Sequence, residues 1–307
     1  MSKSAIEPRD YPSRDLLNKT NLNTHKSLAI SSKGKDLEQP CRIAKAIARA
    51  GLCSRREAER LIQEGRVRIN GKLLTTPACV ITSKDTVNID GFPLPSAPPA
   101  QLWLYHKPKG LVTTHKDPQG RTTVFENLPS HLPRVISIGR LDYNTEGLLL
   151  LTNSGQLARE LELPTTGWLR SYRVRARGRV TADDLETLKN GLQIDGVWYG
   201  PVEASIDSIQ GANTWLTIGI REGKNREVRN IISFLGLTVS RLIRVSFGPF
   251  ELGNLGRGEV QGVSKRHLIE AVGPKISAQI GLIQTTNSRN AKDKRQKMQP
   301  QKNETTK

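Results

Sequence analysis

The sequence has few of the residues that build covalent or metal-held frameworks. Among its 307 residues are only three cysteines, Cys41, Cys53 and Cys79, and they form no C-x-x-C pair. The five histidines are scattered without the spacing of metal ligands. Neither a disulfide framework nor a zinc site is predicted. The expectation is a reduced, cytoplasmic chain that uses no metal.

Long apolar runs are also missing. No run approaches the roughly 18–20 residues that a membrane-spanning helix needs, and the longest apolar piece near the N-terminus is Leu28-Ala29-Ile30. That piece is too short for the core of a signal peptide. The sequence also lacks a P-loop and a glycine-rich dinucleotide turn. We therefore expect no membrane partner, no nucleotide cofactor and no cofactor of any other kind.

Acidic residues are scarce relative to basic ones. The chain has 47 Lys and Arg against 29 Asp and Glu, a formal net charge of +18. Such an excess predicts an anionic partner, and the phosphate backbone of a nucleic acid is the commonest one. Residues 275–307 hold eight basic and two acidic residues without an aromatic, so they are predicted to be a disordered basic tail. Residues 1–40 are polar and are predicted to be disordered as well.

Between these tails the composition predicts two domains. The first covers residues 41–90, a proline-rich linker covers 91–100, and a larger domain covers 101–274. In the first domain, a short amphipathic helix ends at Gly51 and Ser54 caps a second, with Glu57 completing a capping box. The dipeptide Asn70-Gly71 then predicts a hairpin.

The first domain is basic, with ten Lys and Arg against five acidic residues. The arginines predicted to contact RNA lie near the start of the second helix and on the following strand, namely Arg55, Arg56, Arg60, Arg66 and Arg68. Together they would form one face for an RNA backbone, recognised by shape and phosphate rather than by base edges. A solvated helix face is the alternative.

The larger domain contains an aspartate in a distinctive setting. In the segment GRLDYNTEGLLLLTNSG, residues 139–155, Asp142 follows an apolar strand and Arg140. A turn ending at Gly147 and a four-leucine strand come next. Two buried strands would fix the position of this carboxylate while the turn exposes it, which suits catalytic chemistry.

Two further segments carry polar side chains on predicted elements. Residues 168–177 read as a strand with Tyr172, Val174 and Ala176 on one side and three arginines on the other. Residues 222–230, EGKNREVRN, lead into a helix with an apolar stripe that Gly236 ends. Residues 107–110, Lys-Pro-Lys-Gly, form either a simple turn between strands or an element near a site.

These motifs resemble a known family. Residues 139–155 follow the catalytic motif of the RsuA-type RNA pseudouridine synthases almost position by position, and residues 54–71 follow the signature of the S4 RNA-binding domain. The segments 107–110 and 222–230 are similar to the first and third motifs of that family. The implied fold class is α+β: a small S4 domain, then a synthase domain built on a mixed, mainly antiparallel β-sheet with flanking helices.

The resemblance implies roles for individual residues. Asp142 matches the family's nucleophile, Tyr172 its active-site tyrosine, and Arg229 the arginine that pairs with the aspartate. Arg140 is expected to fill the gap left by a flipped base. The other expected RNA contacts of this domain are Lys107, Lys224 and Arg226. Asn230 stands where arginine is common in the family, which affects a peripheral RNA contact only.

The resemblance also implies the reaction, isomerisation of a uridine to pseudouridine in ribosomal RNA. The basic C-terminal extension and the segment around Tyr172 are more similar to the branch that modifies large-subunit (23S) rRNA. Two alternatives stay open: a synthase for small-subunit (16S) rRNA, and a non-catalytic S4-domain assembly factor. A monomer is the simpler expectation for the oligomeric state.

Overall fold

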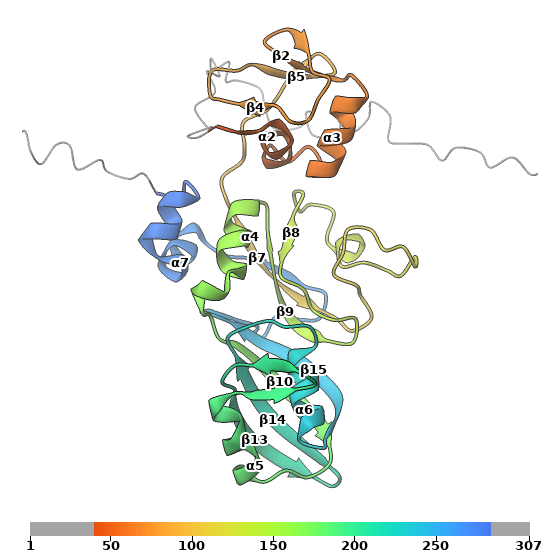
Figure 1. The fold of residues 1–307 in the computed structure, drawn as a ribbon, viewed down its shortest axis with the longest axis vertical. Coiled ribbons are helices and arrows are strands. Elements are labelled where there is room, and N and C mark those ends of the chain that lie inside the picture. The colour runs from red at the N-terminus through yellow and green to blue at the C-terminus, as the bar shows by residue number, and fades with distance from the viewer. Residues whose placement is uncertain (1–39, 284–307) are drawn as a thin grey trace, which may run out of the picture.

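The computed structural model describes residues 40–283 (Figure 1). The predictions for residues 1–39 and 284–307 lie outside this range. The elements of the first domain are β1 (Cys41–Arg42), α2 (Ile43–Arg49), α3 (Arg55–Gln63), β2 (Val67–Ile69), β3 (Lys72–Leu73), β4 (Val80–Ile81), β5 (Val87–Ile89) and β6 (Phe92–Pro93).

The first domain packs two helices against a small sheet of order β3-β2-β5-β6. The capping box of α3 is present, because Ser54 and Glu57 each bond the other's backbone N–H. The hairpin at Asn70-Gly71 joins β2 to β3, and both residues have the positive φ that such a turn needs. The expected linker is shortened, since Phe92 and Pro93 pair with β5 as an edge strand, where proline is tolerated.

The larger domain is built on one mixed sheet of order β13-β14-β10-β15-β9-β7-β17. Its strands are β7 (Leu102–Lys107), β8 (Ile136–Ile138), β9 (Glu146–Thr152), β10 (Arg170–Arg177), β13 (Glu203–Gln210), β14 (Asn213–Ile220), β15 (Thr238–Phe247), β16 (Phe250–Glu251) and β17 (Val260–Gly262). A separate hairpin pairs β11 (Leu192–Ile194) with β12 (Val197–Tyr199). Within this sheet β9 and β15 pair in parallel and the other named strands pair antiparallel, so the predicted mixed, mainly antiparallel sheet is confirmed.

Helices flank this sheet: α4 (Gly155–Glu162), α5 (Ala182–Glu186), α6 (Glu227–Phe234) and α7 (Lys265–Gln279), with 3₁₀ turns η1 (Phe125–Asn127), η2 (Pro164–Thr166) and η3 (Thr187–Asn190). Every residue of β9 is buried. Its Leu148 and Leu150 pack in a cluster with α4 and α7, whereas Leu149 and Leu151 belong to a second cluster that includes α5 and α6. The four-leucine run is therefore a strand covered on both faces.

The larger domain extends beyond the expected boundary at residue 274, which falls inside α7. The helix continues to Gln279 and is kinked at Gly273, whose φ is 76°. Pro274 follows the kink at the start of the next helical turn, where its missing N–H costs no helical hydrogen bond. Ile280 and Leu282 are buried in the cluster with α4, so the core of the domain reaches past the helix.

Candidate active site

Asp142 lies in the connection between β8 and β9, and its backbone is held from several directions. Thr113 donates from Oγ1 to the carbonyl of Leu141 at 2.9 Å, and Gly139 donates its N–H to Glu162 at 2.7 Å. The turn closes on itself, since Thr145 donates its N–H to the carbonyl of Asp142 at 3.0 Å. These bonds fix the backbone of Asp142 between two paired strands, as the sequence predicted.

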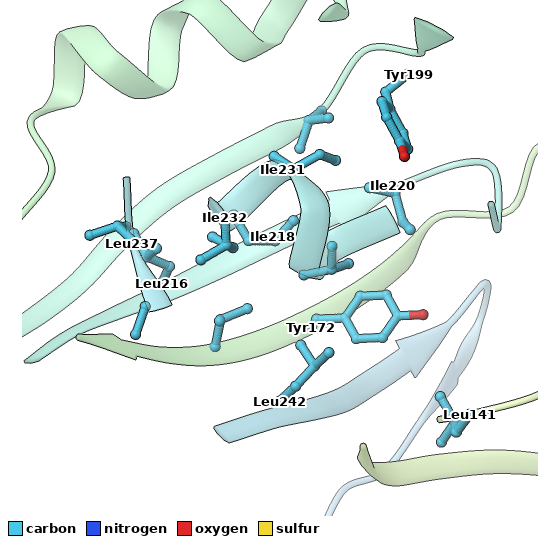
Figure 2. Close-up of a cluster of buried hydrophobic side chains, with 14 of the residues drawn as sticks. Leu141, Tyr172, Tyr199, Leu216, Ile218, Ile220, Ile231, Ile232, Leu237 and Leu242 are labelled. Carbon is cyan, nitrogen blue, oxygen red and sulfur yellow. The ribbon is translucent and has the colours of Figure 1, made fainter. Parts of the chain in front are cut away.

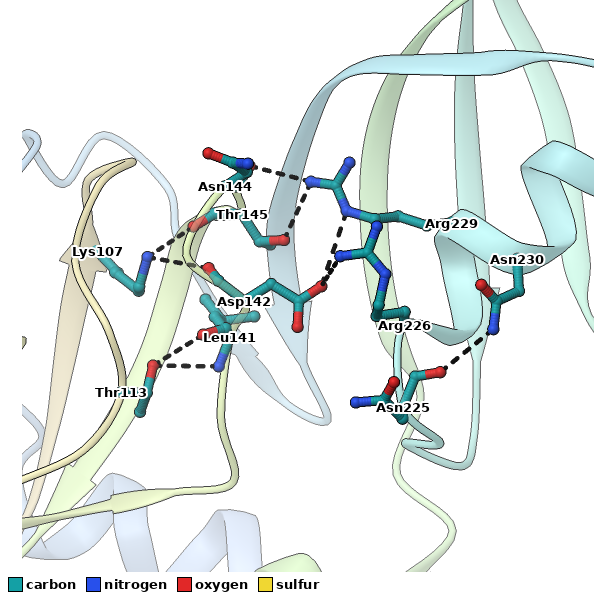
Figure 3. Close-up of polar contacts among 10 residues, drawn as sticks. All are labelled: Lys107, Thr113, Leu141, Asp142, Asn144, Thr145, Asn225, Arg226, Arg229 and Asn230. Atoms are coloured by element: carbon teal, nitrogen blue, oxygen red, sulfur yellow. Dashed lines mark hydrogen bonds and ion pairs between the residues drawn. The ribbon is translucent and has the colours of Figure 1, made fainter. Parts of the chain in front are cut away.

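Lys107 holds the same loop from the end of β7 (Figure 3). Its ammonium donates to the carbonyls of Pro108, Asp142 and Thr145 at 3.1, 3.2 and 2.9 Å, and the residue is fully buried. Burial lowers the pKa of Lys107 to about 8, although Asp142 and Glu146 act in the opposite direction. This environment does not fit the expected RNA contact at Lys107, because three carbonyls occupy its donors and none of its surface reaches solvent.

Two arginines face the carboxylate of Asp142 (Figure 3). The Nε of Arg229 and a terminal nitrogen of Arg226 each lie 3.7 Å from Oδ2 of Asp142. Both side chains come from the start of α6, and Arg226 adopts the left-handed conformation, with φ 51°. The expected pairing with Arg229 is present. The ion pair between Arg226 and Asp142 was not predicted from the sequence, which indicated a phosphate contact for Arg226.

Arg229 is anchored independently of Asp142. Its Nη2 donates to the carbonyl of Asn144 at 3.0 Å and to Oγ1 of Thr145 at 3.5 Å, and only 13% of its side chain is exposed. Its buried Nε has no hydrogen-bond partner among the described residues. Desolvation and the neighbouring Arg226 lower the pKa of Arg229, while Asp142 opposes them. A small approach of the two side chains would turn the ion pair into a direct hydrogen bond.

Tyr172 comes from β10, two strands away from β9 in the sheet order. The residue is 8% exposed and belongs to the buried cluster that includes Ile218 and Leu242 (Figure 2). Together with Arg140, Asp142 and Arg229 it lines a cavity of about 320 Å³. The tertiary structure thus brings the three expected catalytic residues and Arg140 to one pocket.

Other pocket residues were not identified from the sequence. Arg170 and Arg244 are buried, with their guanidinium carbons 4.7 and 5.1 Å from the ring centroid of Phe247. Arg170 donates to the carbonyl of Arg221 at 2.8 Å, and Arg244 donates from Nε to the carbonyl of Leu148 at 2.7 Å. Burial lowers the pKa of Arg170. The burial of Arg244 could have been predicted from the sequence, because Arg244 lies on the same strand face as the apolar Leu242 two residues earlier.

Glu227 is a further pocket residue that the sequence did not indicate. The residue is 3% exposed, and its Oε2 accepts the backbone N–H of Lys224 at 2.8 Å. Burial raises the pKa of Glu227 to about 7, and Glu222 adds to this rise. A carboxyl that takes up a proton near neutral pH therefore lies in the wall of the pocket.

The remaining expected RNA contacts lie at the surface. Arg55 and Arg56 are exposed on the first turn of α3, and Arg60 pairs with Glu64 at the end of the same helix. Arg66 is bound to Asp90 through two hydrogen bonds, and Arg68 donates to the carbonyl of Gly71. In the larger domain, Lys224 pairs with Glu222 at the rim of the pocket. The role of each in RNA binding stays a prediction.

Comparison with known proteins identifies the class. Residues 41–87 match the S4 domain and residues 101–234 match the RNA pseudouridylate synthase family. The chain belongs to the RsuA-type RNA pseudouridine synthases with an N-terminal S4 domain, and is an isomerase that acts on RNA.

Individual relatives support this membership. The chain is 48% identical to an RNA pseudouridine synthase of Rickettsia bellii, over 73% of this chain and 97% of that protein. It is 39% identical to the ribosomal large subunit pseudouridine synthase B of Pseudomonas aeruginosa, over 84% of this chain and 69% of that protein. A crystal structure of a pseudouridylate synthase superposes with a TM-score of 0.55 at 25% identity, covering 76% of this chain and 99% of that one.

Residues 40–283 hold no candidate for two other kinds of site. In this range no three His, Cys, Asp or Glu side chains are grouped as a metal site would require. None of the helices described here is both long and apolar enough to cross a bilayer.

Proposed function

We propose that this enzyme converts one uridine of large-subunit ribosomal RNA to pseudouridine, with Asp142 as the nucleophile. The observation that supports it best is the placement of Asp142, which faces two guanidinium groups at 3.7 Å in a pocket that also contains Tyr172. The relatives named for the large ribosomal subunit support the choice of RNA.

In the proposed reaction the C1′–N1 bond of the uridine breaks, the uracil turns, and a C1′–C5 bond forms. C5 loses a proton and N1 gains one, so no redox partner is needed. Asp142 acts on the ribose side of the base, either by attacking C1′ or by promoting a glycal route. Its side chain is 35% exposed, which leaves it accessible to an incoming ribose.

The side chains around Asp142 would serve the flipped base. Arg229 and Arg226 would stay paired with the carboxylate once the base excludes water, because an unpaired buried charge is strongly disfavoured. Stacking on Tyr172 would offset about 1–3 kcal/mol of the cost of unstacking the base. Arg140, an exposed residue in the lining of the pocket, would occupy the gap left in the RNA.

The test of the target is a carbodiimide map of pseudouridine in rRNA from cells with and without this protein. We expect one signal to disappear from large-subunit rRNA and to return when the gene is restored. Loss of a small-subunit signal instead would assign the enzyme to the other ribosomal subunit. Unchanged maps in both subunits would contradict the proposal.

The test of the nucleophile is Asp142→Asn. The neutral amide keeps the shape of the side chain but cannot attack C1′, so we expect RNA binding close to wild type and no product. Binding is measured by fluorescence anisotropy and product by carbodiimide mapping of the same RNA. Measurable turnover by this variant would refute the assignment.

A further inference from the structure

The strand that carries Tyr172 into the pocket presents a row of arginines on its opposite face. In β10, Tyr172, Val174 and Ala176 are buried, and Arg173, Arg175 and Arg177 are exposed between them. Successive outward side chains on a strand are about 6.6 Å apart. The residues of β10 that line the active-site pocket are among the buried ones.

Within residues 40–283, this part of the sheet is covered on one face only. Leu185 of α5 and Val228, Ile231 and Ile232 of α6 pack with the buried residues of β10, and Figure 2 shows α6 lying over these strands. On the neighbouring strand β14 the alternate residues Trp215 and Thr217 are partly exposed. The arginine row therefore belongs to an open face of β10 and β14.

An aromatic ring lies beside the row. The guanidinium carbon of Arg173 is 4.9 Å from the ring centroid of Trp215, and Trp215 is the cross-strand neighbour of Arg175. Asp207 of β13 fixes Arg173 there, since it pairs with Arg173 at 3.4 Å and accepts a hydrogen bond from Thr217 at 2.8 Å. Arginines with an adjacent indole form the kind of surface on which nucleic acid bases stack and phosphates pair.

Only part of the charge of the row is paired within residues 40–283, where Asp207 pairs with Arg173. Among the described residues, Arg175, Arg177 and Arg179 have no acidic partner. Arg241, which lies directly across from Arg175 on β15, is bound instead by Glu146 at 2.9 Å. Like charges placed side by side on a sheet destabilise it. An anionic partner at this face would remove that repulsion.

The row of arginines ends beside a depression in the protein surface. Arg177 and Arg179 line a shallow depression of about 430 Å³ with Gly178, Gly211 and Ala212. The three small residues carry no long side chains into the depression, so a phosphate there would have the two arginines as its charged partners.

We propose that this open face, defined by Arg173, Arg175, Arg177, Arg179 and Trp215, is a second RNA-binding surface. It binds a strand of the substrate RNA outside the flipped nucleotide, with phosphates on the arginines and a base on Trp215. Because Tyr172 and Arg173 point to opposite faces of β10, this strand is a different segment of the RNA from the one in the pocket. The proposal rests on the chain acting on RNA, and not on which uridine is modified.

The test compares two variants of the full chain that lose the same charge. Arg175→Ala/Arg177→Ala removes the centre of the row, and Lys265→Ala/Arg266→Ala removes two exposed charges from α7. Affinity for a fluorescein-labelled RNA hairpin and for labelled oligouridine is measured by anisotropy at several salt concentrations. We expect the row variant to reduce the slope of log affinity against log salt by about 2, since each lost phosphate contact removes about 1.

A second measurement needs no substitution. Ultraviolet crosslinking of the unmodified chain to oligouridine, followed by mass spectrometry, is expected to recover the peptide that contains Trp215. Equal slopes for the two variants would overturn the proposal, and so would absence of that crosslink. If the face binds a protein instead, the row variant keeps its RNA affinity and the proposal fails in the same way. Binding is read without turnover, so failure here is distinct from failure of the uridine assignment.

Discussion

At the scale of single residues, the site is governed by the different burial of its charged groups. The carboxylate of Asp142 is partly exposed, the guanidinium of Arg229 is mostly covered, and the ammonium of Lys107 is fully covered. At about 4 Å and an effective dielectric constant near 20, an ion pair is worth roughly 4 kcal/mol before desolvation. The two arginines at 3.7 Å therefore attract the carboxylate of Asp142 while a ribose can still reach it.

The buried lysine predicts a defect in both stability and catalysis. Lys107→Met removes the buried donor to three carbonyls, so we expect a loss of about 2–5 kcal/mol in the free energy of unfolding. The turn around Asp142 would also loosen, and kcat should fall more than RNA affinity. Urea unfolding and single-turnover kinetics check the two effects. The exposed Lys109 provides the control, and Lys109→Met should change neither.

The raised pKa of Glu227, about 7 against an ordinary 4.5, predicts a pH dependence of stability. The folded state holds this proton more tightly than the unfolded state, so its contribution is complete below pH 4.5 and is lost as the pH rises through 7. Glu227→Gln should match wild type at the acidic end of this range and exceed it by about 3 kcal/mol near pH ~8, measured by urea unfolding.

Glu222→Gln is the comparison for that experiment, because the pKa of this neighbouring carboxyl shifts in the opposite direction. Burial alone would raise the pKa of Glu222, but hydrogen bonds from Gly200 and Lys224 outweigh it and lower the pKa. The ionised form of Glu222 therefore stabilises the folded state above its ordinary pKa, and its removal should cost stability there. If both variants were more stable than wild type at alkaline pH, the opposite pKa shifts assigned to Glu227 and Glu222 would be contradicted.

At the scale of elements, the site depends on the parallel contact between β9 and β15. Gly147, with φ 103°, lies against the backbone of Arg244, and a Cβ at this position would overlap that backbone. The close approach brings the loop of Asp142 next to the strand that carries Arg244 and Leu242 into the pocket. Glu146 adds an ionic link, since it binds both Arg241 and Arg257.

This contact predicts that Gly147→Ala is severely destabilising. Neither strand can move without breaking its hydrogen bonds, so we expect a loss of at least about 3 kcal/mol, measured by thermal and urea unfolding. Gly139→Ala is the control, because Gly139 also has a positive φ, 68°, but has open space around it. That variant should lose only about 1–2 kcal/mol. Equal losses would show that backbone conformation, and not the close approach, sets the cost.

At the scale of the whole molecule, the S4 domain and the synthase domain have separate hydrophobic cores. One cluster contains Ile43, Ile47 and Ile62, and none of its members belongs to the two clusters of the synthase domain. A separate core allows a domain to unfold on its own. The net charge of +18 over the whole chain favours an anionic partner.

Separate cores predict separate responses to core mutations. Ile62→Ala should destabilise the S4 domain by about 2–5 kcal/mol and leave hydrogen exchange in the synthase sheet unchanged. Ile232→Ala, equally buried in the other core, should do the reverse. Hydrogen exchange with mass spectrometry distinguishes the two. Loss of protection in both domains from either variant would show that they unfold as one unit.

Local features of this protein could be predicted from sequence because their causes lie within a few residues. The capping box at Ser54, the turn at Asn70-Gly71 and the alternation along residues 170–177 each depend on neighbouring side chains and backbone. The identity of Asp142, Tyr172 and Arg229 as site residues came from motif resemblance, and the fold places all three at one pocket.

Other features depend on contacts between segments that are far apart in the sequence. Lys107 lies 35 residues from Asp142, and nothing near it in the chain indicates that its ammonium is enclosed by the Asp142 loop. Arg226, Glu227 and Arg244 likewise acquire their roles from strands and turns far away in sequence. Burial and charge pairing depend on which elements pack together in the folded chain. A sequence pattern shows only which face of each element is apolar and which is polar.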